Sequence, residues 1–121
     1  MDKWALVVDD SPTAVELLRR SLAQLHITAQ GVGTGEEALD FLVQAESLPN
    51  YVFMDVMMPG IDGFETTQRI LSKSRTAHLP IIIYTTLKSA EDQAKAKTAG
   101  AIGFLAKPFN QSGLKACLEQ L

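Results

Sequence analysis

Charged and hydroxyl side chains follow the apolar runs of this sequence, and their types suit metal chemistry. In chain order these residues are Asp9, Asp10, Asp55, Thr85 and Lys107. Carboxylates packed together raise each other's pKa and cost stability unless a cation lies among them. A hard divalent ion such as Mg²⁺ suits them, because it prefers oxygen ligands and takes few carboxylates from a protein. If the fold brings these residues together, they form a metal-binding acidic site with a lysine beside it.

The four charged residues among these also have ordinary structural explanations. Asp9 and Asp10 can stabilise the dipole of a helix that begins just after them, and Asp55 can cap the loop that follows it. Lys107 can be an exposed surface lysine, which is common. Taken together, the placement of all these residues at strand ends favours a shared site over separate structural roles.

Five short apolar runs predict five β-strands, at residues 4–8, 27–32, 51–54, 81–84 and 102–106. Four runs are almost continuously apolar, which is typical of parallel strands covered on both faces. Thr28 and Gln30 interrupt the second run. We therefore expect the second strand to lie nearer an edge of the sheet.

Helical patterns lie between and after the strands. Apolar residues recur at helical spacing from the Ser11-Pro12 start to residue 25, and again at 34–43, 63–71, about 89–98 and from about 110. Alternating strands and helices with right-handed crossovers form a doubly wound α/β domain of three layers. Such sheets bind ligands beyond the carboxyl ends of their strands, which is where the charged residues above are predicted to lie.

Length and charge limit the possible functions. A chain of 121 residues fits one domain, residues 1–121, and a net charge of −3 argues against nucleic-acid and anionic membrane surfaces. The only cysteine, Cys117, cannot form an intrachain disulfide, which indicates a reducing compartment. No leader peptide and no apolar run of bilayer length is seen, so we expect a cytoplasmic protein.

Four sequence motifs together carry a family resemblance. They are VVDDS at 7–11, MDVMMPGIDG at 54–63, PIIIYT at 80–85 and GFLAKPF at 103–109. With these in order, the whole chain resembles the receiver domains of two-component response regulators, the class typified by the chemotaxis protein CheY. The resemblance implies a five-stranded parallel sheet in a flavodoxin-like (βα)5 fold with strand order 2-1-3-4-5.

The resemblance also implies a role for each acid. Asp55 would accept a phosphoryl group from a phosphohistidine on a sensor histidine kinase or a histidine phosphotransfer domain. Asp9 and Asp10 would hold Mg²⁺, with Asp10 as a direct ligand and Asp9 acting partly through water. Asp55 and the backbone carbonyl of Met57 would complete the protein ligands.

The remaining roles concern the phosphoryl group and the switch. Lys107 would pair first with Asp55 and then with the phosphoryl group, and Thr85 would donate its hydroxyl to a phosphoryl oxygen. Phe104, where Tyr is commoner, would turn inward when Thr85 moves. The fourth helix, fifth strand and fifth helix would form the output face for a downstream effector or a fused output domain.

The resemblance implies a signalling switch rather than an enzyme with an external substrate. The chain would catalyse only its own phosphorylation and dephosphorylation, bind no nucleic acid or membrane directly, and exist as a monomer or a phosphorylation-dependent dimer. A stand-alone shuttle, a phosphorelay intermediate and a regulatory domain of a larger protein all fit the sequence.

Two other functions compete with this one. A degenerate receiver that binds partners without phosphate usually lacks an acid or the lysine, whereas all are present here. A metal-dependent phosphatase would need a carboxylate two residues after Asp55, where Met57 stands.

Met57 and Leu87 are apolar where CheY has an amide and an acid that position hydrolytic water, which predicts a long-lived phosphoryl group. Thr86 is larger than the usual Ala or Gly, and its bulk narrows access to that group.

Overall fold

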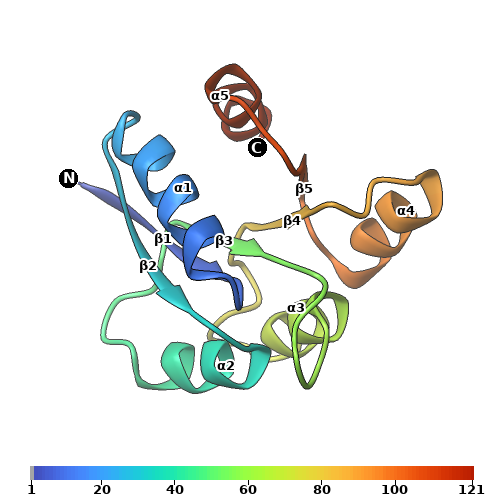
Figure 1. Cartoon of the computed structure of the whole chain (residues 1–121). Coiled ribbons are helices and arrows are strands. Elements are labelled where there is room, and N and C mark those ends of the chain that lie inside the picture. The colour runs from blue at the N-terminus through green and yellow to red at the C-terminus, as the bar shows by residue number, and fades with distance from the viewer. Residues whose placement is uncertain (1) are drawn as a thin grey trace.

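The computed structural model describes residues 2–121, in which strands and helices alternate along the chain (Figure 1). The strands are β1 (Lys3–Val8), β2 (Ile27–Val32), β3 (Tyr51–Met54), β4 (Ile81–Thr85) and β5 (Gly103–Ala106). The helices are α1 (Pro12–Ala23), α2 (Gly35–Gln44), α3 (Gly63–Leu71), α4 (Ala90–Ala99) and α5 (Gln111–Glu119). The elements expected from the sequence are therefore all present, with ends that differ by no more than two residues.

The five strands form one parallel sheet in the order β2-β1-β3-β4-β5. This confirms both the order that the resemblance implies and the edge position expected for β2. In the register, Val8 of β1 lies between Val32 of β2 and Met54 of β3. These three neighbouring strands therefore end at the same level of the sheet.

Helices cover both faces of the sheet, which gives three layers (Figure 1). One face packs against α1 and α5, through Leu18, Leu22 and Leu114. The other packs against α2, α3 and α4, through Leu42, Ile70 and Ala96. Because successive strand side chains point to opposite faces, a strand buried on both sides must be apolar throughout. All five residues of β4 are accordingly buried.

Each helix begins with a polar side chain that caps a free backbone N–H. The capping residues are Ser11, Thr34, Asp62, Ser89 and Asn110. These caps set where each helix leaves the rim formed by the carboxyl ends of the strands.

A bilayer-spanning helix needs about 20 apolar residues, and no helix within residues 2–121 meets that requirement.

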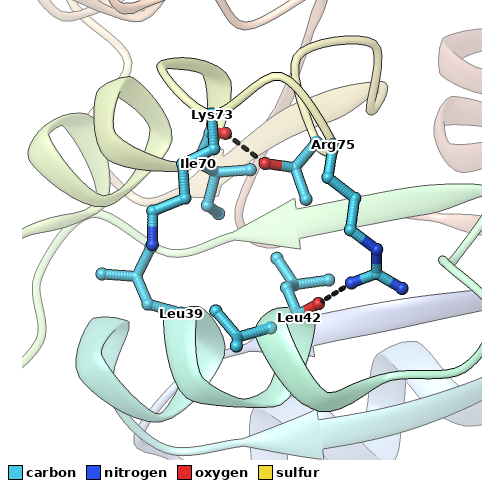
Figure 2. A pocket seen from close by; sticks show the side chains of 7 residues that line it. Leu39, Leu42, Ile70, Lys73 and Arg75 are labelled. Atoms are coloured by element: carbon cyan, nitrogen blue, oxygen red, sulfur yellow. Dashed lines mark hydrogen bonds between the residues drawn. The ribbon is translucent and has the colours of Figure 1, made fainter.

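Arg75 lines a small cavity between α2 and α3 and reaches across to Leu42 of α2 (Figure 2). The Arg75 guanidinium donates hydrogen bonds to the backbone carbonyls of Leu42 and Ala45, where α2 ends. The cavity measures about 40 Å³. That volume holds a water or two rather than a metabolite. The two hydrogen bonds of Arg75 fasten the segment after α3 to the end of α2.

Candidate functional site

The register of the sheet brings Asp9 and Asp55 side by side. Val8 pairs with Met54 across β1 and β3, so the next residue of each strand leaves the sheet at the same level. The backbone N–H of Asp55 donates to the carbonyl of Val8 at 2.9 Å. Both acids are buried, with 3% of Asp9 and 7% of Asp55 exposed.

Three carboxylates form the floor of the site. One oxygen from each of Asp9, Asp10 and Asp55 lies within 4.8 Å of the others, and Asp10 is the exposed member. Within residues 2–121 no hydrogen bond or ion pair engages the Asp10 carboxylate, which leaves its oxygens open to solvent. Oxygen donors from two buried acids and one exposed acid make an acidic pocket of the kind that binds Mg²⁺.

Lys107 brings a positive charge to the same pocket from the end of β5. Its Nζ lies 2.6 Å from Asp9 Oδ2 and 3.6 Å from Asp55 Oδ2. The backbone N–H of Lys107 donates to the carbonyl of Thr85 at 2.8 Å, which holds this part of the chain to β4. The ammonium therefore contacts both buried acids, with the shorter contact to Asp9.

The electrostatics of the pocket act on the proton affinity of Asp55. Burial raises the pKa of the Asp55 carboxyl, and the negative charge of Asp9 raises it further. The nearby Lys107 ammonium and the backbone N–H of Val56, which donates to Asp55 Oδ1 at 2.9 Å, act in the opposite direction. Burial is the strongest of these effects, so the charged carboxylate of Asp55 is destabilised and favours a cation nearby.

An aromatic ring with no role assigned from the sequence also borders the pocket. Lys107 Nζ lies 4.3 Å from the ring centroid of Tyr84, which is 2% exposed. Burial, together with the charges of Asp9 and Asp55, raises the pKa of Tyr84 to about 12. In the sequence Tyr84 reads only as the end of an apolar strand, and the available signal was an aromatic residue directly before Thr85.

Thr85 and Phe104 occupy neighbouring strands. Thr85 is 1% exposed, and its Oγ1 accepts a hydrogen bond from the Leu87 N–H at 3.2 Å. Phe104 of β5 pairs in register with Ile83 of β4 and is partly buried against the core below α4. It lines a groove of about 370 Å³ between α4 and β5.

Met57 and Leu87 line the same groove beside the exposed acid of the site. With Asp10 they line a wide groove of about 640 Å³, and 63% of Met57 is exposed. Two apolar residues therefore share this groove with Asp10.

The start of α3 packs directly on the backbone of Asp55. A Cβ placed on Gly63 would lie 2.1 Å from the Asp55 carbonyl oxygen, which no real contact allows. Only glycine at this position lets α3 begin so close to the third acid.

Comparison with known proteins identifies the family. Residues 5–119 match the response regulator receiver domain. The chain belongs to this family. The receiver domain is 34% identical over 121 residues to the response regulator PleD of Caulobacter vibrioides, covering 100% of the chain and 26% of PleD. It is 34% identical over 110 residues to protein PilH of Pseudomonas aeruginosa, covering 90% of the chain and 88% of PilH.

Solved structures agree with this assignment. The receiver domain superposes on the chemotaxis protein CheY4 of Vibrio cholerae with a TM-score of 0.89 and 30% identity, over 99% of the chain and 98% of CheY4. Membership of the family implies phosphorylation-dependent signalling, in which response regulators interact with kinases and output domains. The chain spans about a quarter of the length of PleD.

Proposed function

We propose that this receiver domain is a signalling switch in which Asp55 accepts a phosphoryl group from a histidine kinase or a histidine phosphotransfer domain. One observation carries the proposal: the Asp55 carboxylate lies at the strand rim with Lys107 3.6 Å away and oxygens of Asp9 and Asp10 within 4.8 Å. A carboxylate can accept a phosphoryl group as an aspartyl phosphate. The pocket around it supplies the charge pattern that this transfer needs.

In the proposed transfer, a carboxylate oxygen of Asp55 bonds to phosphorus while the phosphorus–nitrogen bond of the phosphohistidine breaks. The leaving imidazole keeps the electron pair of that bond. Phosphoryl transfer depends mainly on positioning and on neutralising charge on the equatorial oxygens. Lys107 contributes one positive charge from its place beside Asp55.

Mg²⁺ would supply the remaining positive charge when bound. Asp9, Asp10, Asp55 and the backbone carbonyl of Met57 would hold it, which accords with the oxygen donors that this ion prefers. The exposed Asp10 offers an unengaged carboxylate and is the best placed of them to be a direct ligand.

The switch would use the added charge of the phosphoryl group, which is about −1.5 to −2. The Thr85 hydroxyl would leave the Leu87 N–H that it accepts from and donate to a phosphoryl oxygen. Phe104 would then turn inward from its partly buried position. These two movements would change the face made by α4, β5 and α5, where a downstream effector or a fused output domain would bind.

Residues 1–121 would work as one receiver domain in the cytoplasm. It would turn over no external substrate, contact no nucleic acid or membrane directly, and exist as a monomer or a phosphorylation-dependent dimer. The mild net charge of −3 is consistent with a protein partner.

The test is to incubate the protein with Mg²⁺ and acetyl phosphate and to follow its intact mass over time. We expect the gain of one phosphoryl group, which is lost both in Asp55→Asn and when EDTA removes the metal. If the folded protein gains nothing, a histidine phosphotransfer domain carrying a labelled phosphoryl group replaces acetyl phosphate, because Thr86 can restrict a small donor. Failure with both donors would contradict the proposal and favour a binding module that works without phosphate.

A further inference from the structure

Tyr84 lies directly beneath the lysine of the acidic pocket. Its ring centroid is 4.3 Å from Lys107 Nζ, whereas the same nitrogen is 2.6 Å from Asp9 and 3.6 Å from Asp55. We propose that Tyr84 is a positioning residue whose ring face holds the Lys107 ammonium within reach of the phosphoryl acceptor Asp55. This inference rests on the phosphoryl-accepting role proposed above.

The two acids alone leave the position of the ammonium poorly defined. Lysine carries its charge on a flexible stem of four carbons, and the shorter contact draws it toward Asp9. A third contact from a different direction is needed to keep it also beside Asp55. The Tyr84 ring provides that contact from β4, the strand between β3 and β5.

An aromatic face is well suited to this task because it attracts a cation without neutralising it. The interaction is stronger when the partners are shielded from water, and here 2% of Tyr84 and 17% of the Lys107 side chain are exposed. A carboxylate in the same place would add a fourth negative charge to the pocket. The ring thus holds the ammonium while leaving its charge available to a phosphoryl group.

The ring is itself held in place by the chain that follows Lys107. Phe109 packs edge-to-face on Tyr84, with ring centroids 5.8 Å apart and planes at 75°. Thr85 and Ala106, the neighbours of Tyr84 and Lys107, pair in register across β4 and β5. Both Lys107 and Phe109 therefore fold back onto one ring, which fixes the direction from which the lysine enters the pocket.

The ring, rather than the hydroxyl, is the part of Tyr84 that matters here. Within residues 2–121 no hydrogen bond to the Tyr84 hydroxyl is found, whereas the hydroxyl of Tyr51 accepts one from Lys3. Removing the hydroxyl should leave the contact with Lys107 intact. Removing the ring should abolish it.

The experiment compares Tyr84→Phe, which keeps the ring, with Tyr84→Leu, which replaces it by an aliphatic side chain. Phe53→Leu is the matched control, because Phe53 is a fully buried aromatic residue of the same core cluster but makes no cation–π contact with Lys107. The first readout is the NMR shift of the Lys107 side-chain protons next to Nζ, which a ring face moves upfield. The second is the rate of phosphorylation by acetyl phosphate, separated into maximal rate and half-saturation.

We expect Tyr84→Phe to keep the upfield shift and the wild-type rate. Tyr84→Leu should lose the shift and lower the maximal rate about tenfold, which lies between the effects expected of an exposed and of a fully shielded cation–π contact. Phe53→Leu should lose stability but keep both the shift and the rate, which separates positioning from general damage to the core.

Two results would overturn the inference. One is a Tyr84→Leu protein that keeps the wild-type maximal rate, and the other is a Lys107 shift that does not respond to loss of the ring. Either would leave the proposed function standing, provided that the wild-type protein takes up a phosphoryl group. A wild-type protein that takes up none from either donor contradicts the proposed function instead, and with it the role of Tyr84 in transfer.

Discussion

Two ion pairs of equal length but different burial allow the energetics of the pocket to be tested. Lys107 and Asp9 are 2.6 Å apart with side chains 17% and 1% exposed, and Arg69 and Glu65 are also 2.6 Å apart but 53% and 48% exposed. Distance alone would predict the same loss of folding stability when either cation is removed. The difference in burial predicts a much larger loss of stability when Lys107 is replaced than when Arg69 is replaced.

Replacing Lys107 by Met leaves the Asp9 carboxylate buried without a cation. Removing one partner of a buried pair costs about 3–5 kcal/mol. Because the pocket opens to solvent at Asp10, we expect the lower end of that range, about 3 kcal/mol. Replacing Arg69 by Met breaks an exposed pair and should cost less than about 1 kcal/mol.

The free energy of unfolding of both variants is measured by urea denaturation in metal-free buffer at neutral pH. If the free energy of unfolding falls by about 2 kcal/mol per M urea, a loss of about 3 kcal/mol in that free energy lowers the urea midpoint by about 1.5 M. The loss in Lys107→Met should shrink as the pH falls. Without the ammonium, the folded-state pKa of Asp55 rises further, because Lys107 no longer lowers it, and protonation of this carboxyl as the pH falls removes one of the buried negative charges.

Equal losses in the two variants would refute this reasoning. So would a loss in Lys107→Met that stays constant down to the onset of acid unfolding. Either result would mean that water already compensates Asp9 and that the pocket is less shielded than its exposed fractions indicate.

Three further predictions concern residues around the same site and the helix beside it. Burial raises the folded-state pKa of Asp55 above its unfolded value, so wild-type stability should fall as the pH rises through that folded pKa. Asp55→Asn should lack this slope and be the more stable protein at neutral pH, as measured by urea unfolding in EDTA. Within residues 2–121 the fully buried hydroxyl of Thr67 has no hydrogen-bond partner, so Thr67→Val should leave stability unchanged or raise it by about 1 kcal/mol. Thr66→Val loses a hydrogen bond of 2.7 Å to a backbone carbonyl and should cost about 1 kcal/mol in the same assay, so equal effects would count against the contrast. Finally, Met57→Asn combined with Leu87→Glu should shorten the phosphoryl lifetime about tenfold or more by positioning water, measured as decay of the phosphorylated mass. An unchanged lifetime would contradict the role given to this apolar pair.

Much of the fold was predictable because burial on both faces of a sheet leaves a direct mark in the sequence. The nearly continuous apolar runs predicted four strands, and the interrupted run at 27–32 predicted the edge strand β2. The strand order came from the family resemblance, since periodicity carries no information on which strands are neighbours.

The residues of the candidate site were also predictable as a set. Asp9, Asp55 and Lys107 follow strands directly, and parallel strands bring such residues to one rim. The distances among them were not predictable. The resemblance implied a first pairing of Lys107 with Asp55, whereas the shorter contact in the fold is to Asp9.

The sequence was thus sufficient to determine which residues lie at the rim, because local patterns of burial and strand ends are properties of short segments. Only the tertiary structure decided how those residues meet. Lys107 and Asp9 are 98 positions apart, and their contact depends on the register of four strands and on the helices between them. The same long-range packing turns the ring of Tyr84 toward Lys107 and brings Gly63 against the backbone of Asp55. Contacts of this kind depend on how whole elements pack against one another, and no local pattern in the sequence records that.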